Sequence, residues 1–227
     1  MQPIPAIVRA GEETIVEMRG VRKAFGPVVA LDGATFELRE REIHGLLGGN
    51  GAGKTTLMNI LYGLYRADAG EIFLDGKPVE IRSPKDALRY GIGMVHQHFL
   101  QIESFTVAQN IILGMPLRGP FLFNLDREEG RIRELALRFG LEVDPRARME
   151  ELPIGARQRV EILKALYRNV RILILDEPTT NLTPQEVDAL FRSLRVLVGE
   201  GISIVFITHK IREALGVCDR ISVMRQG

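Results

Sequence analysis

A glycine-rich loop between an apolar run and a helical pattern is the feature that most constrains how this chain can fold. Residues 48–56 read Gly-Gly-Asn-Gly-Ala-Gly-Lys-Thr-Thr, which matches the phosphate-binding loop G-x-x-x-x-G-K-[ST] at every fixed position. The apolar residues 43–47 before the loop predict a strand. Residues 54–65 after it predict a helix, with Leu57, Ile60, Leu61 and Leu64 on one face. Strand, loop and helix in this order predict an α/β phosphate-binding fold.

The chemistry expected of this loop is the binding of ATP and magnesium. Glycines let the backbone bend so that successive N–H groups and the following helix N-terminus face phosphate oxygens. Lys54 is expected to reach the β- and γ-phosphates, and the Thr55 hydroxyl to bind Mg²⁺. The predicted ATP-binding residues of the loop are Gly48, Gly49, Asn50, Gly51, Ala52, Gly53, Lys54, Thr55 and Thr56.

A second signal is an apolar run, residues 172–175, that ends in Asp176 and Glu177. Near-continuous apolar runs are typical of strands buried on both faces of a parallel sheet, and ligands bind where such strands end. We expect Asp176 to hold magnesium through water and Glu177 to act as the base or to polarise the attacking water. Because the two carboxylates follow a phosphate-binding loop, they are stronger evidence for a nucleotide site than they would be alone.

Three further residues stand where they could complete the site. Gln97 follows the predicted strand 92–95 and could bind magnesium; His209 follows the predicted strand 202–207 and could hydrogen-bond the γ-phosphate. Phe25 could stack on adenine. Each also has a structural interpretation, as a histidine after a strand or a packed aromatic residue. His96 and His98 resemble a metal-binding pair, but without a nearby cysteine or third histidine we do not predict a metal site there.

The remaining pattern divides the chain into an α/β core and an inserted helical part. Strands are predicted on both sides of a turn at residues 25–27 and in a hairpin around Asp75-Gly76 with arms 71–74 and 79–81. Ser83, Pro84 and Asp86 predict a helix start. Between residues 99 and 166 only helices are predicted, at 106–113, 127–139 and 155–167. A capping box beginning at Thr183 predicts a helix to about residue 198.

The predicted fold is therefore a P-loop NTPase core with a mainly parallel sheet, an N-terminal antiparallel β subdomain and a helical subdomain. The boundaries are 12–97 and 168–227 for the core and 98–167 for the helical subdomain, within one domain of residues 1–227. The first ten residues contain two prolines and no periodic pattern, and are predicted to form a loose tail. Hydrophobic residues make up 45% and charged residues 26%, as in ordinary globular proteins.

Charge and composition limit the class of partner and the cellular location. A formal net charge of +1 gives no sign of a nucleic-acid partner, and a single cysteine, Cys218, excludes an internal disulfide framework. No run approaches the roughly 18 apolar residues of a membrane span, and no secretory signal is evident at the start. These features favour a cytoplasmic location or a peripheral one at the cytoplasmic face of the cell membrane.

The order aromatic residue, phosphate loop, glutamine, helical part, Asp-Glu and histidine resembles the nucleotide-binding domain of ABC transporters over residues 14–227. The resemblance implies an adenine platform at Phe25, a magnesium-sensing Gln97 and a switch histidine at His209. Stretches 93–99, 160–166 and 182–186 are most similar to the ATPases of simple-sugar and nucleoside importers. Such ATPases imply a second ATP-binding domain, in tandem or as a homodimer, transmembrane permease subunits and, indirectly, a solute-binding protein.

Two motifs depart from that family. The signature Leu-Ser-Gly-Gly-Gln, which reaches the γ-phosphate bound to a partner domain, is replaced by Leu152, Pro153, Ile154, Gly155 and Ala156. Pro153 offers no donor, although Gly155 keeps its N–H. Thr183 stands where the family has an aspartate. The chain resembles the first half of a tandem protein. The alternative function is that of a regulatory domain that binds ATP with little hydrolysis. The low net charge and the lack of a long coiled-coil insertion disfavour a third possibility, a soluble ABC ATPase of translation or DNA repair.

Overall fold

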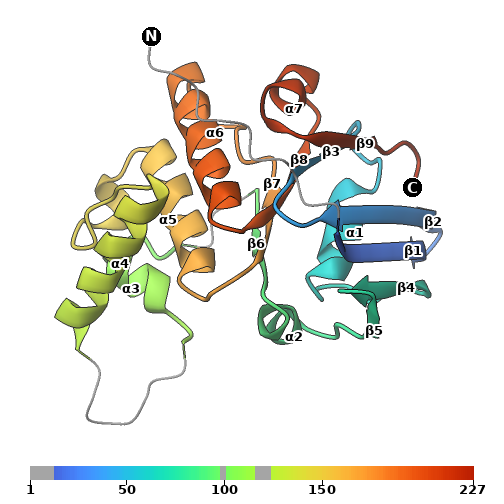
Figure 1. The fold of residues 1–227 in the computed structure, drawn as a ribbon, viewed down its shortest axis with the longest axis horizontal. Helices are drawn as coiled ribbons and strands as arrows, with labels where there is room; N and C mark the ends of the chain where they lie inside the picture. The colour runs from blue at the N-terminus through green and yellow to red at the C-terminus, as the bar shows by residue number, and fades with distance from the viewer. Residues whose placement is uncertain (1–12, 98–100, 116–123) are drawn as a thin grey trace.

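The computed structural model describes residues 13–97, 101–115 and 124–227, and contains two β-sheets and a group of helices (Figure 1). The expected tail and His98 lie outside the described residues. The strands are β1 (Thr14–Phe25), β2 (Val28–Arg39), β3 (Ile43–Leu47), β4 (Ala69–Leu74), β5 (Lys77–Val79), β6 (Ile92–Val95), β7 (Ile172–Asp176), β8 (Ser203–Thr208) and β9 (Arg220–Val223). The helices are α1 (Lys54–Leu61), α2 (Pro84–Arg89), α3 (Val107–Ile112), α4 (Leu125–Phe139), α5 (Ile154–Leu166), α6 (Pro184–Gly199) and α7 (Ile211–Val217), with a short 3₁₀ turn, Met149–Glu151.

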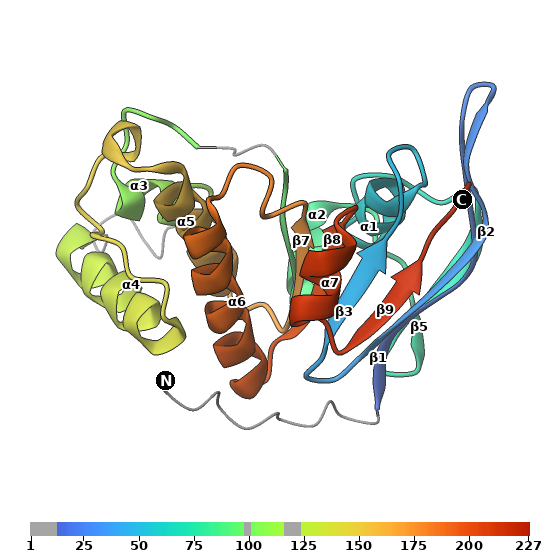
Figure 2. The same ribbon diagram turned by 90° about the horizontal axis from the view of Figure 1, so that it is seen from above.

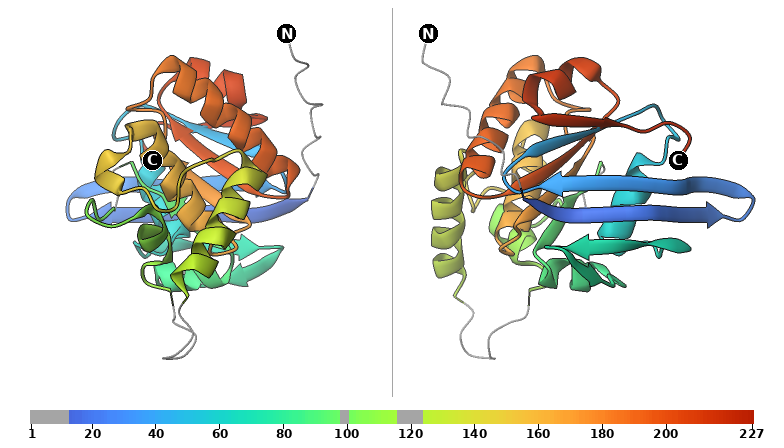
Figure 3. Two further views of the ribbon diagram at one scale, coloured as in Figure 1. Left: turned by 90° about the vertical axis from the view of Figure 1, so that its left-hand side faces the viewer. Right: turned by 45° about the vertical axis from the view of Figure 1, so that its right-hand side comes forward.

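The antiparallel sheet has the order β2-β1-β4-β5. The β1 and β2 strands form the hairpin predicted around residues 25–27, which extends beyond the rest of the molecule in Figure 3. The β4 and β5 strands form the second hairpin, where Asp75 adopts a positive φ of 50° and Gly76 one of 72°. This arrangement confirms the predicted antiparallel β subdomain.

The second sheet is parallel throughout, with the order β6-β7-β8-β3-β9. Strands β3, β6, β7 and β8 are buried because the sheet separates two hydrophobic cores, whereas the edge strand β9 is partly exposed. In β7, Leu173 and Leu175 face the core shared with α3–α6, whereas Ile172 and Ile174 face the core shared with α1 and the antiparallel sheet. The apolar runs in the sequence are continuous because alternate residues of each strand face different hydrophobic cores.

The helices lie mainly at one end of the molecule. Helices α3, α4 and α5 lie together, away from the antiparallel sheet (Figure 2). In the parallel sheet, α5 packs against β6 and α6 against β8. Ser83 caps α2, and Thr106 and Thr183 form complete capping boxes at α3 and α6. The three helices predicted between residues 99 and 166 are thus present.

Three sequence expectations are corrected. Helix α1 ends at Leu61 rather than Tyr65, because Gly63 takes a positive φ of 78°, and Leu64 is consequently exposed instead of lying on the buried face. Strand β5 stops at Val79 and does not include Ile81. Helix α7 and strand β9 were not predicted, and β9 completes the parallel sheet by pairing with β3.

Candidate active site

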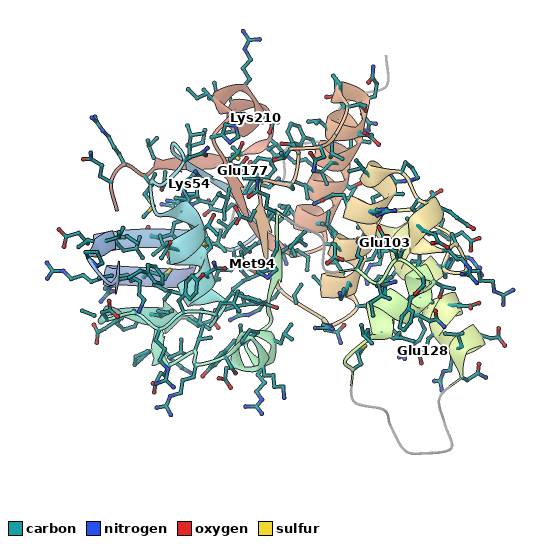
Figure 4. The ribbon with its side chains drawn as sticks, turned by 180° about the vertical axis from the view of Figure 1, so that it is seen from behind. Lys54, Met94, Glu103, Glu128, Glu177 and Lys210 are labelled. Carbon is teal, nitrogen blue, oxygen red and sulfur yellow. The ribbon has the colours of Figure 1, made fainter. Side chains whose placement is uncertain are left out.

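The candidate site lies where four neighbouring parallel strands end. Because β6, β7, β8 and β3 are adjacent and parallel, the residues after their carboxyl ends share one edge of the sheet. Asp176 is the last residue of β7 and Glu177 follows it. Gln97 follows β6, His209 follows β8, and the phosphate-binding loop follows β3. Figure 4 shows Lys54 and Glu177 at this edge, apart from Glu103 and Glu128 on the helical part.

The phosphate-binding loop is fixed by tight packing against β2. Gly53 has a φ of 98°, and a Cβ atom there would stand 2.7 Å from the Ala30 carbonyl oxygen, so only glycine fits. Lys54 is buried, and its ammonium donates hydrogen bonds to the carbonyl oxygens of Gly48, at 2.8 Å, and Gly49, at 3.0 Å. The ammonium therefore lies over the loop that is expected to hold the phosphates. Thr55, at the start of α1, is exposed.

Asp176 is suited to the predicted magnesium role. Its side chain is buried, and within the described residues its Oδ1 atom has no hydrogen-bond partner. Burial raises the pKa of Asp176 and the charge of Glu177 adds to this rise, while a hydrogen bond from the Thr55 hydroxyl opposes it. A buried carboxylate oxygen without a partner next to a threonine hydroxyl presents the oxygen ligands that Mg²⁺ prefers. Thr55 and Asp176 therefore fit the ion.

Glu177 and His209 are in direct contact. The Glu177 Oε1 and His209 Nδ1 atoms are 2.8 Å apart, and the backbone N–H of Glu177 donates to the carbonyl of Ile207 in β8. Glu177 adopts a positive φ of 50°, which turns its side chain away from the direction that β7 would give it. The pairing of β7 with β8 thus places an acid and a histidine, 32 residues apart in the sequence, as one unit beside the phosphate-binding loop.

The outer predicted residues lie near this unit. Gln97 is exposed and lines a small cleft together with Glu177 and Asn181. The ring of His96 packs edge-on to Tyr62, and burial lowers the pKa of His96, with the Asp176 charge opposing that shift. The structure therefore brings Gln97 to the edge occupied by Glu177.

Phe25 lies at the end of the β1–β2 hairpin. The residue is 42% exposed. Its ring packs edge-on against Tyr65 at a centroid distance of 5.2 Å and has the Lys23 ammonium 5.5 Å from its centre. A half-exposed ring held by a second aromatic residue can offer a face for stacking.

The signature segment at the N-terminus of α5 contains a contact that the sequence did not predict. Pro153 is the N-cap of α5 and provides no side-chain cap, and Pro153 and Ile154 are both exposed. Gly155 is buried against the carboxylate of Glu186 from α6. The sequence marked Glu186 only as the N3 residue of the capping box that begins at Thr183. Its second contact, with Gly155, joins residues 31 positions apart on two helices, so no local pattern could reveal it.

The charge state of Glu186 reflects both contacts. The backbone N–H of Thr183 has the largest effect in lowering the pKa of Glu186, followed by the Thr183 hydroxyl; burial opposes them, and the N–H of Gly155 lowers it further. Hydrogen bonds to the ionised form keep this carboxylate negative. The Gly155 backbone therefore has a negative charge beside it from the same chain.

Comparison with known proteins agrees with the geometry. Residues 31–180 match the family model described as ABC transporter. The chain is 49% identical, over 95% of its length, to a glucose import ATP-binding protein of Haloferax volcanii, covering 44% of that protein. It is also 49% identical, over 95% of its length, to a nucleoside import ATP-binding protein of Lactococcus lactis, covering 42% of it. The chain thus spans less than half the length of these relatives.

Solved structures show the same fold. The ADP conformation of an ATP-binding cassette of an ABC transporter matches with a TM-score of 0.84 at 25% identity, covering 94% of this chain and 88% of the other. A dimeric bacterial ABC transporter cassette matches with a TM-score of 0.80 at 25% identity, covering 94% and 95%. No helix in the described part of the chain is long and apolar enough to cross a membrane. With its phosphate-binding loop, Asp176, Glu177 and His209 on one sheet edge and the family match over residues 31–180, this chain belongs to the ABC transporter ATP-binding family.

Proposed function

We propose that this chain binds and hydrolyses ATP to power an importer of a nucleoside or a simple sugar. The contact between Glu177 and His209 at the end of β7 and β8 is the observation that carries the proposal. Nucleotide binding alone would require only the phosphate-binding loop. A glutamate held by a histidine beside that loop is in addition suited to activating water for hydrolysis. The import functions named for the two relatives support the choice of solute class.

The residues divide the reaction among them. Backbone N–H groups of residues 48–56 and the Lys54 ammonium bind the phosphates, and Phe25 stacks on adenine. Thr55, Gln97 and Asp176 hold Mg²⁺, which neutralises charge on the phosphate oxygens when bound. Glu177 accepts a proton from the attacking water, or orients it, and His209 holds Glu177 and hydrogen-bonds the γ-phosphate. Positioning and charge neutralisation do most of the work in such a displacement.

The proposal extends to partners and location. The chain pairs with a second ATP-binding domain, a tandem half or another copy, and the dimeric cassette structure supports such pairing. Residues 98–167 form the helical subdomain that passes movement to transmembrane permease subunits, which receive solute from a binding protein, and residues 12–97 and 168–227 form the ATPase core. The protein works peripherally at the cytoplasmic face of the cell membrane and has no nucleic-acid partner.

Steady-state ATP hydrolysis with and without the membrane partners tests this function. We expect magnesium-dependent hydrolysis that rises when the permease subunits and solute-loaded binding protein are present. ATP binding without hydrolysis in both conditions would overturn the proposal.

That negative result would favour the second candidate, a regulatory domain that binds ATP and hydrolyses it poorly. Pro153 and the Glu186 carboxylate against Gly155 are the observations behind this candidate. They concern what the chain offers to a partner's nucleotide, however, and leave Lys54, Asp176, Glu177 and His209 in place for its own.

A further inference from the structure

Glu186 connects the signature segment to the loop that precedes α6. Its Oε2 atom accepts hydrogen bonds from the backbone N–H and the hydroxyl of Thr183, both at 2.9 Å. Its Oε1 atom lies so close to Gly155 that a methyl group on that glycine would overlap it. One carboxylate therefore caps the N-terminus of α6 with one oxygen and lies against Gly155, at the N-terminus of α5, with the other.

This position conflicts with the use of α5 as a phosphate ligand. A helix N-terminus attracts anions through its free N–H groups and its partial positive charge. Here a charged carboxylate already lies against Gly155, so it reduces the positive potential at the N-terminus of α5. An approaching γ-phosphate would meet a like charge beside this helix end. The two anions cannot both use this helix end well.

A neighbouring cavity offers the Glu186 carboxylate a second position. A cavity of about 350 Å³ lies between α5 and α6, and Gly155, Arg159 and Glu186 are among its lining residues. Within the described residues, the Nε atom of Arg159 is buried without a hydrogen-bond partner. Arg159 is one turn along α5 from Gly155, and its charge already helps to lower the pKa of Glu186. A rotation of the Glu186 side chain into the cavity would bring the carboxylate closer to this guanidinium.

We propose that Glu186 competes with a partner domain's γ-phosphate for the N-terminus of α5, and that the signature segment engages the partner only when this carboxylate moves from Gly155 to Arg159. The inference rests on the proposed function, because it requires a second ATP-binding domain facing this one. It assigns to Glu186 an autoinhibitory role, in addition to its capping of α6.

The test compares ATP-driven dimerisation of the full chain carrying Glu177→Gln, which removes the expected base, with the same chain carrying Glu186→Gln as well. Glutamine keeps the size of the side chain and is the other residue used at this capping-box position, so the fold is retained. Asp188→Asn is the matched control, since it removes one exposed carboxylate from the same helix. Sedimentation velocity gives the dimer dissociation constant with saturating MgATP, with MgADP and without nucleotide.

Removal of the Glu186 charge is expected to tighten the MgATP dimer by about threefold to tenfold, the size of effect a charge at a helix end produces. The control should leave the constant unchanged, and neither variant should alter the MgADP result. Equal dimer constants with and without Glu186→Gln, including no association by either, overturn the inference. Binding of a fluorescent ATP analogue to the monomer is measured separately, and failure there would count against the proposed function instead.

Arg159→Gln provides a second arm. Loss of this cation should weaken the MgATP dimer about twofold to threefold while Glu186 is charged. It should have no effect once Glu186 is glutamine, because Arg159 acts on the dimer only by receiving the Glu186 carboxylate. An equal effect of Arg159→Gln in both backgrounds would show that Arg159 does not receive the carboxylate and would overturn that step.

Discussion

The nucleotide edge of the parallel sheet and the signature segment at the N-terminus of α5 are built in different ways. The edge collects groups from four adjacent strands, and Lys54, Asp176 and Glu177 are all buried or nearly so. The signature segment depends on a single helix end, where Pro153 supplies no donor and Gly155 faces Glu186. A site fixed by a sheet keeps its geometry without a partner, whereas a site made by one helix end can be changed by one side chain.

The largest expected effect lies at the edge. Glu177→Gln should keep ATP bound and reduce turnover in the assembled transporter by about 100-fold or more, because a positioned base contributes that much. Single-turnover hydrolysis and retention of labelled ATP measure the two effects. Glu134→Gln, at an exposed position of α4, is the control. Undiminished turnover would remove Glu177 from the role of base.

The sheet behind the edge is held by a buried ionic cluster at the opposite end of β3. Glu42 is fully buried and accepts hydrogen bonds from Arg220 at 2.9 and 3.0 Å, while His44 lies 3.3 Å from Glu42 and 2.8 Å from the Ser222 hydroxyl. Glu42→Gln should lower the free energy of unfolding by about 3 kcal/mol, because it leaves a cation without its partner. Urea unfolding measures this loss, with exposed Glu71→Gln as the control.

The same cluster gives the protein a pH dependence of stability. Burial alone would raise the pKa of Glu42, but hydrogen bonds from His44, Arg220 and the Arg39 backbone bring it down to about 2. A lowered native pKa means that the stabilisation is present above the ordinary value of 4.5 and is lost as pH falls towards 2. Unfolding curves at pH 7, 4 and 3 should show this loss, and the Glu42→Gln variant should show a smaller one. Parallel losses in both forms would assign the acid sensitivity to other groups.

At the phosphate loop, Lys54→Ala should weaken ATP binding by about 10-fold to 100-fold, the cost of one charge-assisted hydrogen bond. Titration with a fluorescent ATP analogue measures the affinity, and exposed Lys77→Ala is the control. A loss of similar size for both lysines would indicate that general charge, not the position over the loop, binds the phosphates.

The smallest effect is expected at the signature segment. Pro153→Ser restores a hydroxyl at the N-cap of α5, and should raise ATP hydrolysis of a homodimer by only about twofold, because Glu186 still occupies Gly155. Combined with Glu186→Gln, the gain should exceed the product of the two single gains. Unchanged activity in both the single and double variants would mean that the missing serine does not limit the signature.

The comparison also shows where sequence reasoning works. The phosphate loop, Asp176 and Glu177 follow from a local motif and from strands with continuous apolar character, so they could be placed before the structure was known. Helix α7 and strand β9 were missed because they are short and their residues are not periodic: Leu215 and Val223 are exposed, at 70% and 73%. Strand β9 forms because β3 has an open edge, which is a tertiary circumstance.

By itself the sequence determined the elements that carry the chemistry, since turn glycines, capping residues and apolar periods act within a few residues of each other. Only the tertiary structure decided which elements became neighbours. The pairing of β7 with β8 brought Glu177 to His209, and the packing of α6 against α5 brought Glu186 to Gly155. Both contacts join residues about 30 positions apart, where burial and strand order, and not local propensity, set the distance.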